Sequence, residues 1–468
     1  MKILEKVYNN ICNNKDYIYG EYNVHNICFS YIYNEVLCDS KSINEYILKP
    51  LSYLRKKECL NLDIFLPNSN IKRIKEDEII KYLNDGFCII SSNYLYAVEL
   101  RNNLGRNIGM VTSELSLNGP KDSFTEIFNN NIGLIRKRIS SSKLRIDTIS
   151  IGKYTNTKVG VLSIDGIVKK DLVYHVIKNL SNIDIDGIID SSYLKESLEN
   201  HFNLFPTIMM SERPDKCSMA LLEGKVVIIV DNSCYGLILP SFFFDYFHTT
   251  DDYYQKSIHT TFIRFVRLCA FFIAIYIPAI YIAVTTRNYN FIPFNLLLIL
   301  KAGRTFVPFP AYIEAFFMIL CFEILKESDL RMSTMSGSSI SILGGLILGD
   351  AAVSAGIVSP IMIIVIAISS IAGLIFASVE LGNALRAFKL FLLILSSIFG
   401  LYGIVLGTIF ILIILFKTEI FGYSYLYFDK NEILDSFFRI NRRKRYRNSI
   451  LTNNIYRGKI KWENILFF

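Results

Sequence analysis

The distribution of apolar residues divides this chain of 468 residues into two parts with opposite solvent preferences. Residues 1 to about 260 contain no apolar run long enough to cross a bilayer, whereas four such runs crowd into residues 268–416. A helix rises about 1.5 Å per residue and the hydrocarbon core is roughly 30 Å thick, so about 20 apolar residues span it. The sequence therefore predicts a soluble head followed by an all-α, polytopic membrane domain.

The predicted membrane domain occupies residues 261–416 and contains two kinds of apolar segment. Four are long enough to be full spans, namely 268–284, 306–325, 357–377 and 390–416. Two are shorter and interrupted by Pro or Gly, namely 291–300 and 338–349. Non-helical backbone at membrane depth is tolerated only where protein or a water-filled cavity satisfies its polar groups. We therefore interpret the short segments as broken or re-entrant helices that line a pathway.

Basic residues flank the predicted membrane domain on both sides. Lys256, Arg264 and Arg267 surround the start of the first span, and the tail at 417–468 holds 11 Lys and Arg against 5 Asp and Glu, including RRKRYR at 442–447. Such clusters favour the cytoplasmic side and attract anionic membrane lipid, and nucleic-acid binding is the weaker interpretation. We therefore predict that head and tail are both cytoplasmic, which four crossings would satisfy.

The head alternates strand-like and helical apolar patterns, which is typical of an α/β fold. Two segments resemble each other, because Gly86 opens FCIISSNYLYAVEL and Gly224 opens KVVIIVDNSCYGLIL. This predicts two hairpin-bearing subdomains, related by duplication or alike by chance. We place these subdomains at 71–150 and 151–260, after a divergent N-terminal segment at 1–70.

The sequence carries no motif of a common enzyme, cofactor site or metal site. It has no nucleotide-binding glycine loop, zinc-protease helix or serine-hydrolase elbow. Its nine cysteines show no CxxC spacing, which predicts a reduced compartment and no structural metal. The N-terminus lacks the apolar core of a signal peptide, so we expect no secretion by that route. We therefore expect no catalytic residue, no cofactor and no metal, and a protein that is not an enzyme.

Two polar patterns in the head have both a functional and a structural explanation. Asp184 and Asp186 precede Gly187 as at the start of a calcium loop, but no acidic ligand follows at the later positions. A helix-to-strand turn is the better interpretation. The RKR run at 136–138 could grip phosphate, whereas a solvated helix end with favourable dipole placement explains it more simply.

Two carboxylates interrupt the second predicted span, where a charge normally faces a cavity or a partner. Glu323 has Lys326 one turn further on, so an ion pair explains it. Glu314 has no counter-charge among its sequence neighbours and follows Pro308 and Pro310. These three residues are therefore candidates for a pore or gate, with a structural contact between helices as the alternative for Glu314.

Small residues recur in two parts of the predicted membrane domain. They lie in SGSSISILGG at 336–345 and at Gly400, Gly403 and Gly407 of the fourth span. Such spacings let helices approach closely, so we predict self-association into a homo-oligomer through the membrane domain.

Ordered segments from about residue 80 to 425 closely resemble the GerA family, the A subunits of nutrient germinant receptors in bacterial endospores. The segments are NGPKDSFTEIFNNNIGLIRKRI at 118–139, IDIDGII at 183–189, SERPDK at 211–216, LLEGKVVIIVD at 221–231, LILP at 237–240, DDYYQ at 251–255, VPFPAYIEA at 307–315, AAVSAGIVSP at 351–360 and ELGNALR at 380–386. Three places depart from the family pattern. AGRTF at 302–306 varies the approach to the Pro pair, Asn232-Ser233-Cys234 replaces a Gly-Thr-Pro kind of turn, and Asp350 stands where Gln is expected. Asp350 puts a charge near the proposed pathway, so it joins the pore or gating candidates.

The resemblance implies a two-part cytoplasmic α/β head and a multi-pass domain in the spore inner membrane. It also implies assembly with a permease-like B subunit and a lipoprotein C subunit into a complex that senses amino acids, sugars or nucleosides. The A subunit would oligomerise into a ring and form an ion channel that releases monovalent cations. Two alternatives remain open: a relative like stage V sporulation protein AF, which amplifies germination without sensing a nutrient, and a secondary transporter built from the same broken helices.

Overall fold

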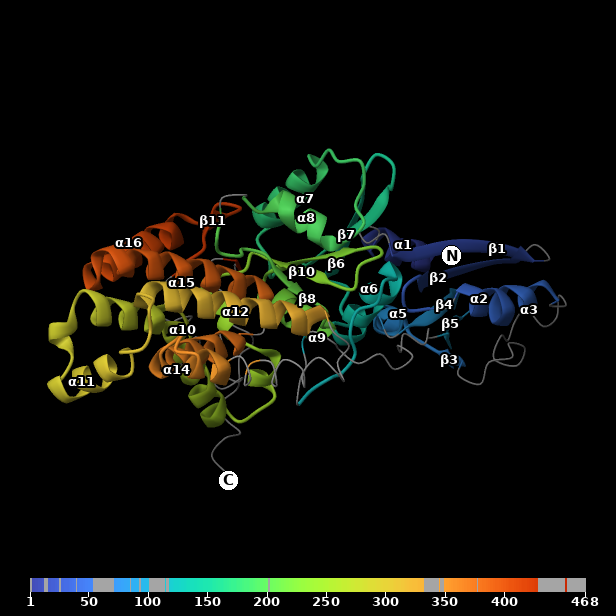
Figure 1. Cartoon of the computed structure of the whole chain (residues 1–468). Coiled ribbons are helices and arrows are strands. Elements are labelled where there is room, and N and C mark those ends of the chain that lie inside the picture. Colours follow the sequence, from blue (N-terminus) through green and yellow to red (C-terminus); the bar gives the residue numbers. More distant parts are fainter. Residues whose placement is uncertain are drawn as a thin grey trace, which may run out of the picture. The chain divides into compact units, whose positions relative to one another are not determined.

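The computed structural model divides into two compact units, which we describe separately (Figure 1). The head unit comprises residues 1–202, 207–241 and 440–468, and the helical unit comprises residues 203–206 and 242–439. The structure describes residues 2–11, 16–24, 27–38, 40–53, 71–84, 86–91, 94–100, 114, 118–200, 203–331, 345, 349–376, 378–427 and 451–452. The predicted lipid-binding run at 442–447 lies outside these residues.

The first sheet of the head unit has five antiparallel strands in the order β1-β2-β4-β5-β3. They are β1 (Tyr17–Val24), β2 (Ile27–Asn34), β3 (Ile71–Arg73), β4 (Phe87–Ser91) and β5 (Leu95–Glu99). Side chains alternate between its faces, so that Ile89 packs against α1 (Lys2–Ile11) and α5 (Ile79–Asn84). Cys88 and Ile90 pack against α2 (Ser40–Ile43), η1 (Asn44–Leu48) and α3 (Lys49–Ser52) on the other face. The boundary we predicted at residue 70 therefore falls inside this sheet.

The second sheet also has five antiparallel strands, in the order β6-β7-β9-β10-β8. They are β6 (Leu144–Ile151), β7 (Thr157–Ile164), β8 (Met209–Ser211), β9 (Val226–Val230) and β10 (Gly236–Leu239). The helices of this half are α6 (Phe128–Arg138), α7 (Lys170–Ser181), α8 (Ser191–Leu198) and α9 (Pro214–Leu222). Helix α6 packs on the sheet, because a Cβ at Gly160 would lie 2.8 Å from the Phe128 ring. The predicted boundary at 150 therefore falls within β6, and this half begins before it.

The two sheets repeat one topology. In each, the first two strands form a hairpin, the last two form a second hairpin beside it, and the third strand lies at the far edge. A helix ends shortly before Gly86 (φ 81°) in one half and Gly224 (φ 90°) in the other, and a buried strand follows each glycine. The likeness noticed at Gly86 and Gly224 is thus part of a repeated five-strand arrangement, and the predicted α/β class of the head is confirmed.

The tail returns to the head unit. Thr452 forms an isolated antiparallel bridge with Val168, and the Lys169 N–H donates to the Leu451 carbonyl at 3.0 Å. These described tail residues therefore pack against the second sheet's half of the head.

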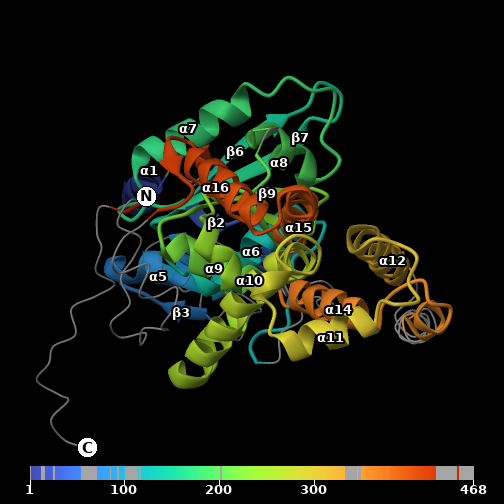
Figure 2. The same ribbon diagram turned by 60° about the vertical axis from the view of Figure 1, so that its left-hand side comes forward.

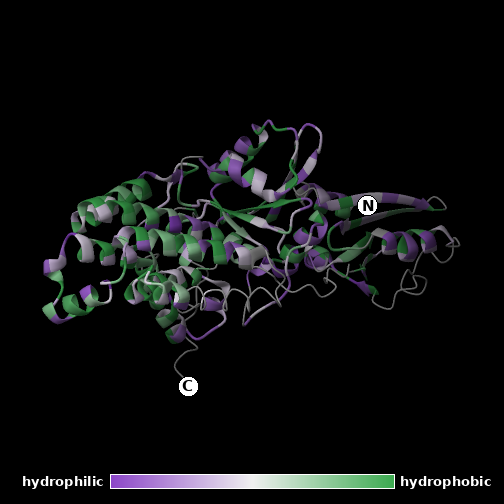
Figure 3. Ribbon diagram, viewed as in Figure 1, coloured by the Kyte–Doolittle hydropathy of each residue, from purple (hydrophilic) through white to green (hydrophobic). Residues whose placement is uncertain are grey.

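The helical unit consists mainly of apolar helices (Figure 3). They are α10 (Ser257–Thr286), α11 (Phe294–Ala302), α12 (Ala311–Arg331), α14 (Pro360–Leu374), α15 (Val379–Phe399) and α16 (Leu401–Lys417). Among the described residues, α10 and α15 are long and apolar enough to cross a membrane, and α14 and α16 are shorter apolar helices. The all-α class of this part is confirmed, whereas only part of the predicted set of spans meets the length and composition criteria. The short segment at 291–300 forms most of α11, and most of 338–349 lies outside the described residues.

The helices do not alternate as we expected for consecutive spans. The start of α12 contacts the residue before α14 through Glu314 and the Ser359 N–H, and the later residues of both helices line one cavity. Helices α12 and α14 are therefore parallel. Helix α15 runs the opposite way to α12, since Arg386 near its start contacts Glu323 in the second half of α12.

The predicted fourth span, 390–416, is two helices rather than one. The chain reverses at Gly400 (φ 63°, ψ −141°), and α15 and α16 lie side by side (Figure 2). Gly403 and Gly407 of α16 approach Leu395 and Leu392 of α15 within this hairpin. The glycine spacing that we assigned to self-association is thus explained by packing within the chain, and most of the other small-residue segment lies outside the described residues.

The chain enters and leaves the helical unit at the same end. After α16 and a short hairpin of β11 (Glu419–Ile420) and β12 (Tyr423–Ser424), the Tyr425 carbonyl accepts from the Phe243 N–H at 3.3 Å. The corner between α14 and α15 lies at this end too, because the Phe376 and Phe247 rings are 5.6 Å apart. We call this end of the helical unit the entry end.

Candidate functional site

The DDYYQ segment anchors the start of α10 through buried charges. Asp252 Oδ2 lies 2.7 Å from Arg267 Nη1 and 3.3 Å from Arg264 Nε, and all three residues are at least nine-tenths buried. Arg267 also donates to the Phe247 carbonyl at 2.9 Å. The sequence suggested that both arginines mark membrane orientation, but they are buried and paired. Their signal for the cytoplasmic side is therefore weaker than we inferred.

The SERPDK segment ties a loop to the second sheet of the head. Arg213 is 1% exposed and forms two hydrogen bonds with Asp215, at 3.0 and 2.7 Å, while it donates to the carbonyls of Glu114 and Pro120. Lys216 Nζ reaches Glu114 at 2.7 Å. These charged groups pair with one another inside the head. The SERPDK segment therefore has a structural role, because it holds the loop against the second sheet.

The two polar patterns of the head have structural roles. Arg136 is buried in an ion pair with Asp16, and Arg138 pairs with Asp122. Arg136 is therefore available neither to bind phosphate nor to lie at a solvated helix end, the two interpretations that we considered. The segment at 183–189 links α7 to α8, not a helix to a strand as predicted, and Asp184 forms an ion pair with Lys153. No cluster of metal-binding side chains occurs among the described residues.

The turn at Asn232-Ser233-Cys234 holds the start of α8. Ser233 Oγ donates to Asp190 Oδ1 at 2.5 Å, and Asp190 also caps α8 by accepting from the Ser192 N–H. Partial burial raises the pKa of Asp190, but hydrogen bonds from Ser233, Ser192 and Ser191 outweigh it and lower this pKa below its usual range.

We expect Ser233→Ala to lower the free energy of unfolding at pH 7 by about 1 kcal/mol, because it removes a hydrogen bond to a charged group. A carboxyl with a lowered folded-state pKa stabilises above its unfolded pKa of about 3.9, and this contribution is lost as the pH falls through the folded value. Melting temperatures of the full chain and the variant should therefore converge between pH 6 and pH 3. A constant difference across that range would show that Asp190 is not involved.

Glu314 lies in a buried polar contact that joins three segments of the helical unit. It is 1% exposed, and its Oε1 lies 2.9 Å from Arg304 Nη2. Its Oε2 accepts from the Ser359 N–H at 3.1 Å, at the N-terminus of α14, where a negative charge is favourable. Glu314 therefore has a counter-charge in the folded chain, although its immediate sequence neighbours offer none. We noted AGRTF only as a departure from the family pattern, yet it supplies the partner.

The other pore or gating candidates lie near this contact in the sequence but are exposed. Pro308 and Pro310 lie in the segment that leads into α12, and the Pro310 carbonyl accepts from the Glu314 N–H at 3.3 Å. Asp350 is exposed in a short helix at 349–354. The structure thus brings Glu314 together with Arg304 and Ser359, and not with Asp350.

We expect Glu314→Gln to lower the free energy of unfolding by about 1 to 3 kcal/mol, because Arg304 loses its counter-charge while glutamine still accepts from Ser359. The melting temperature of the full chain in detergent measures this. Glu419→Gln, an exposed carboxylate-to-amide change in the same unit, is the control and should have no effect. Equal melting temperatures for both variants would contradict the buried pair.

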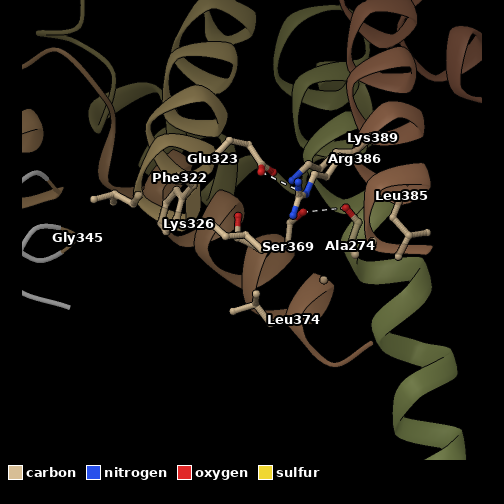
Figure 4. A pocket seen from close by; sticks show the side chains of 14 residues that line it. Ala274, Phe322, Glu323, Lys326, Gly345, Ser369, Leu374, Leu385, Arg386 and Lys389 are labelled. Carbon is tan, nitrogen blue, oxygen red and sulfur yellow. Dashed lines mark hydrogen bonds and ion pairs between the residues drawn. The ribbon is translucent and has the colours of Figure 1, made fainter. Parts of the chain in front are cut away.

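A charged cavity of about 270 Å³ lies between α10, α12, α14 and α15 (Figure 4). Glu323 and Arg386 point toward each other there, with Oε2 and Nε 3.2 Å apart. Lys326 and Lys389 also line it, as do Ser369 and Ser370. The sequence suggested Lys326 as the partner of Glu323, whereas the ion pair is formed by Arg386. Three basic groups and one acidic group give the cavity an excess of two positive charges.

Sequence reasoning missed this cavity because its charges come from two distant segments. One signal was available, since Arg386 and Lys389 are three residues apart on one face of an apolar helix. The arrangement can attract an anion and would repel a cation. We refer to it as the charged cavity.

Comparisons with known proteins match the whole chain. The model of the Bacillus/Clostridium GerA spore germination protein family covers residues 2–449. Spore germination protein KA of Bacillus subtilis (strain 168) is 34% identical over 423 residues, which cover 87% of this chain and 78% of that protein. Spore germination protein GerQA of Bacillus cereus is 31% identical over 436 residues, covering 91% and 87%.

Two further similarities concern a membrane protein and a solved structure. YfkQ of Bacillus subtilis (strain 168), described as an uncharacterized membrane protein, is 31% identical over 438 residues, covering 91% of this chain and 85% of that protein. The crystal structure of the N-terminal domain of the A subunit of the Bacillus megaterium spore germinant receptor GerK3 covers 51% of this chain and 94% of that chain, with 24% identity and a TM-score of 0.38.

Proposed function

Because this chain belongs to the Bacillus/Clostridium GerA spore germination protein family, we propose that it is the A subunit of a nutrient germinant receptor. In this proposal it resides in the spore inner membrane, with head and tail in the cytoplasm. It assembles with a permease-like B subunit and a lipoprotein C subunit. Copies of the chain form an ion channel that opens when the complex senses a nutrient.

The observation that best supports this proposal is a pair of charge contacts within the apolar helical unit. Arg304 with Glu314 joins the turn after α11 to α12, and Arg386 with Glu323 joins α15 to α12. A charged side chain inside an apolar helix bundle costs free energy. Such residues therefore usually mark a site that conducts ions, changes conformation or binds a ligand. If these helices rearrange, the contacts have to break or exchange partners. The helical unit would then have discrete conformations, and binding of a nutrient to the complex could change their populations.

The same charges suggest where cations would pass. The excess positive charge of the charged cavity would repel a monovalent cation, so the conduction path does not run through it. We place the path between copies of the chain in a homo-oligomer. Glu314 then acts as a gating contact rather than as a pore lining, and Glu314→Gln should change potassium release per subunit as well as subunit number.

Conductance in planar bilayers tests the channel directly. We expect the full chain, reconstituted with its B and C subunits, to give discrete current steps when the cognate nutrient is added. Bilayers that receive the B and C subunits alone are the control and should stay silent. Nutrient-dependent solute uptake without current steps would support a transporter and contradict the channel.

A further inference from the structure

We propose that the charged cavity binds a phosphate group. Arg386 neutralises Glu323 at 3.2 Å, which leaves Lys326 and Lys389 as two further positive charges in the lining. Among the described residues, no carboxylate lies within ion-pair distance of either lysine. Cations in an apolar bundle need a counter-charge, and lysines bind phosphate as point charges.

Apart from Gly345, the residues that line the cavity come from four helices. Helix α12 contributes Glu323 and Lys326, and α15 contributes Arg386 and Lys389. Helices α10 and α14 contribute no charged group, because they present Ala274 and two serines, of which Ser369 donates to the Ala274 carbonyl at 2.8 Å (Figure 4). Lys389 is 6% exposed, so its charge is largely withdrawn from solvent. An anion is therefore the ligand that this electrostatic environment favours.

The cavity is also large enough for a phosphate group. Its volume of about 270 Å³ far exceeds the roughly 10 to 15 Å³ that a cavity needs to hold one water molecule, so it can accommodate a phosphate group. Gly373 and Gly382 line it, and a Cβ at either position would meet no atom within 4 Å. A Cβ therefore has space at either glycine, and we expect a larger side chain there to extend into the cavity.

The position of the cavity indicates the source of the phosphate. The last residues of α14 and the first half of α15 line it, so it approaches the entry end of the helical unit. If that end faces the cytoplasm, which rests on the proposed function, the cavity opens near the headgroups of the inner leaflet. Basic pockets between membrane helices on that side bind anionic headgroups. We therefore assign the phosphate to an anionic lipid, and free phosphate is the alternative source.

Two variants test separately whether binding requires the positive charge of the lining and the open volume of the cavity. Lys389→Met removes a positive charge from the lining, and Gly382→Leu fills the space while leaving every charge in place. Lys417→Met at the exposed end of α16 and Gly349→Leu, where a Cβ also meets no atom within 4 Å, are the matched controls. Leucine favours a helix over glycine, so the Gly382 change should not weaken α15 itself.

The test is native mass spectrometry of the purified full chain after reconstitution in phosphatidylcholine nanodiscs with or without phosphatidylglycerol. We expect the wild type and both controls to retain phosphatidylglycerol, and its occupancy to fall at least tenfold in both cavity variants. A second arm adds inorganic phosphate to delipidated protein and follows the melting temperature. If phosphate raises this temperature only in wild type and controls and no lipid is retained, the site stands and its source is free phosphate.

The proposal would be overturned if the wild type and both cavity variants retained lipid equally and responded equally to phosphate. It would also be overturned if the wild type bound neither phosphatidylglycerol nor phosphate. Unchanged elution and helix content by circular dichroism verify that the variants are folded. This assay measures neither germination nor current. The phosphate site can therefore be absent while the receptor function holds, and the receptor function can be wrong while the phosphate site is present.

Discussion

Asp252→Asn should reduce the stability of the helical unit more than any other substitution considered. Removing one partner of a buried charge cluster costs about 3 to 5 kcal/mol, because the remaining charges stay buried without compensation. Here two buried arginines, Arg264 and Arg267, both contact the Asp252 carboxylate, with Arg267 Nη1 at 2.7 Å. Asparagine keeps the shape but carries no charge. We expect a large fall in melting temperature and little full-length protein in the membrane fraction.

Asp165→Asn provides the control, since Asp165 is an exposed carboxylate in the turn after β7. It should leave both measurements unchanged. Arg264→Met in the Asp252→Asn background removes one of the two arginine charges that Asp252 contacts and should recover part of the loss. A melting temperature of Asp252→Asn equal to that of the control would show that the cluster does not hold the start of α10.

Gly400→Ala should disrupt the corner between α15 and α16. The backbone there has φ 63° and ψ −141°, a region that only glycine adopts readily, and a Cβ would lie 2.2 Å from Asn288 Oδ1. Asn288 accepts from the Leu401 N–H at 3.0 Å, so the clash also breaks the contact that ties this corner to the end of α10. We expect a loss of at least about 2 kcal/mol in the free energy of unfolding.

Gly349→Ala is the matched control, because a Cβ at Gly349 meets no atom within 4 Å. It should leave the melting temperature unchanged. Asn288→Ala removes the contact without strain at Gly400 and should cost less than Gly400→Ala. If Gly400→Ala melts like the control, residues 390–416 do not require the reversal and a single long helix becomes the better description.

The sequence predicted the class of each part because hydrophobic period and run length are local signals. The two apolar runs separated by a polar turn in KVVIIVDNSCYGLIL were enough to predict a hairpin after Gly224, which β9 and β10 form. The break at Gly400 was not predicted, because Gly400 lies inside an unbroken apolar run and glycines are common in membrane helices. Its positive φ is a property of the folded chain rather than of the local composition.

The polar contacts were largely hidden because they join distant residues. Glu314 and Ser359 are 45 positions apart, and Glu323 and Arg386 meet across two helices. Nearest-neighbour reasoning selected Lys326 for Glu323 and no partner for Glu314, since it considered only one turn of helix. The resemblance to a family identified the right segments, including those that contain Asp252, Arg213 and Arg386, but not which side chains in them touch.

Potassium release from spores tests the receptor assignment most directly. Spores that lack this chain should fail to release potassium in response to one nutrient or one defined mixture from a panel of amino acids, sugars and nucleosides, while other nutrients still act. Restoring the gene at another locus should restore that response, in proportion to subunit abundance by quantitative blotting. If the loss instead slows release equally for every nutrient, the chain is an amplifier like stage V sporulation protein AF. Unchanged release for the whole panel would contradict a role as a receptor subunit.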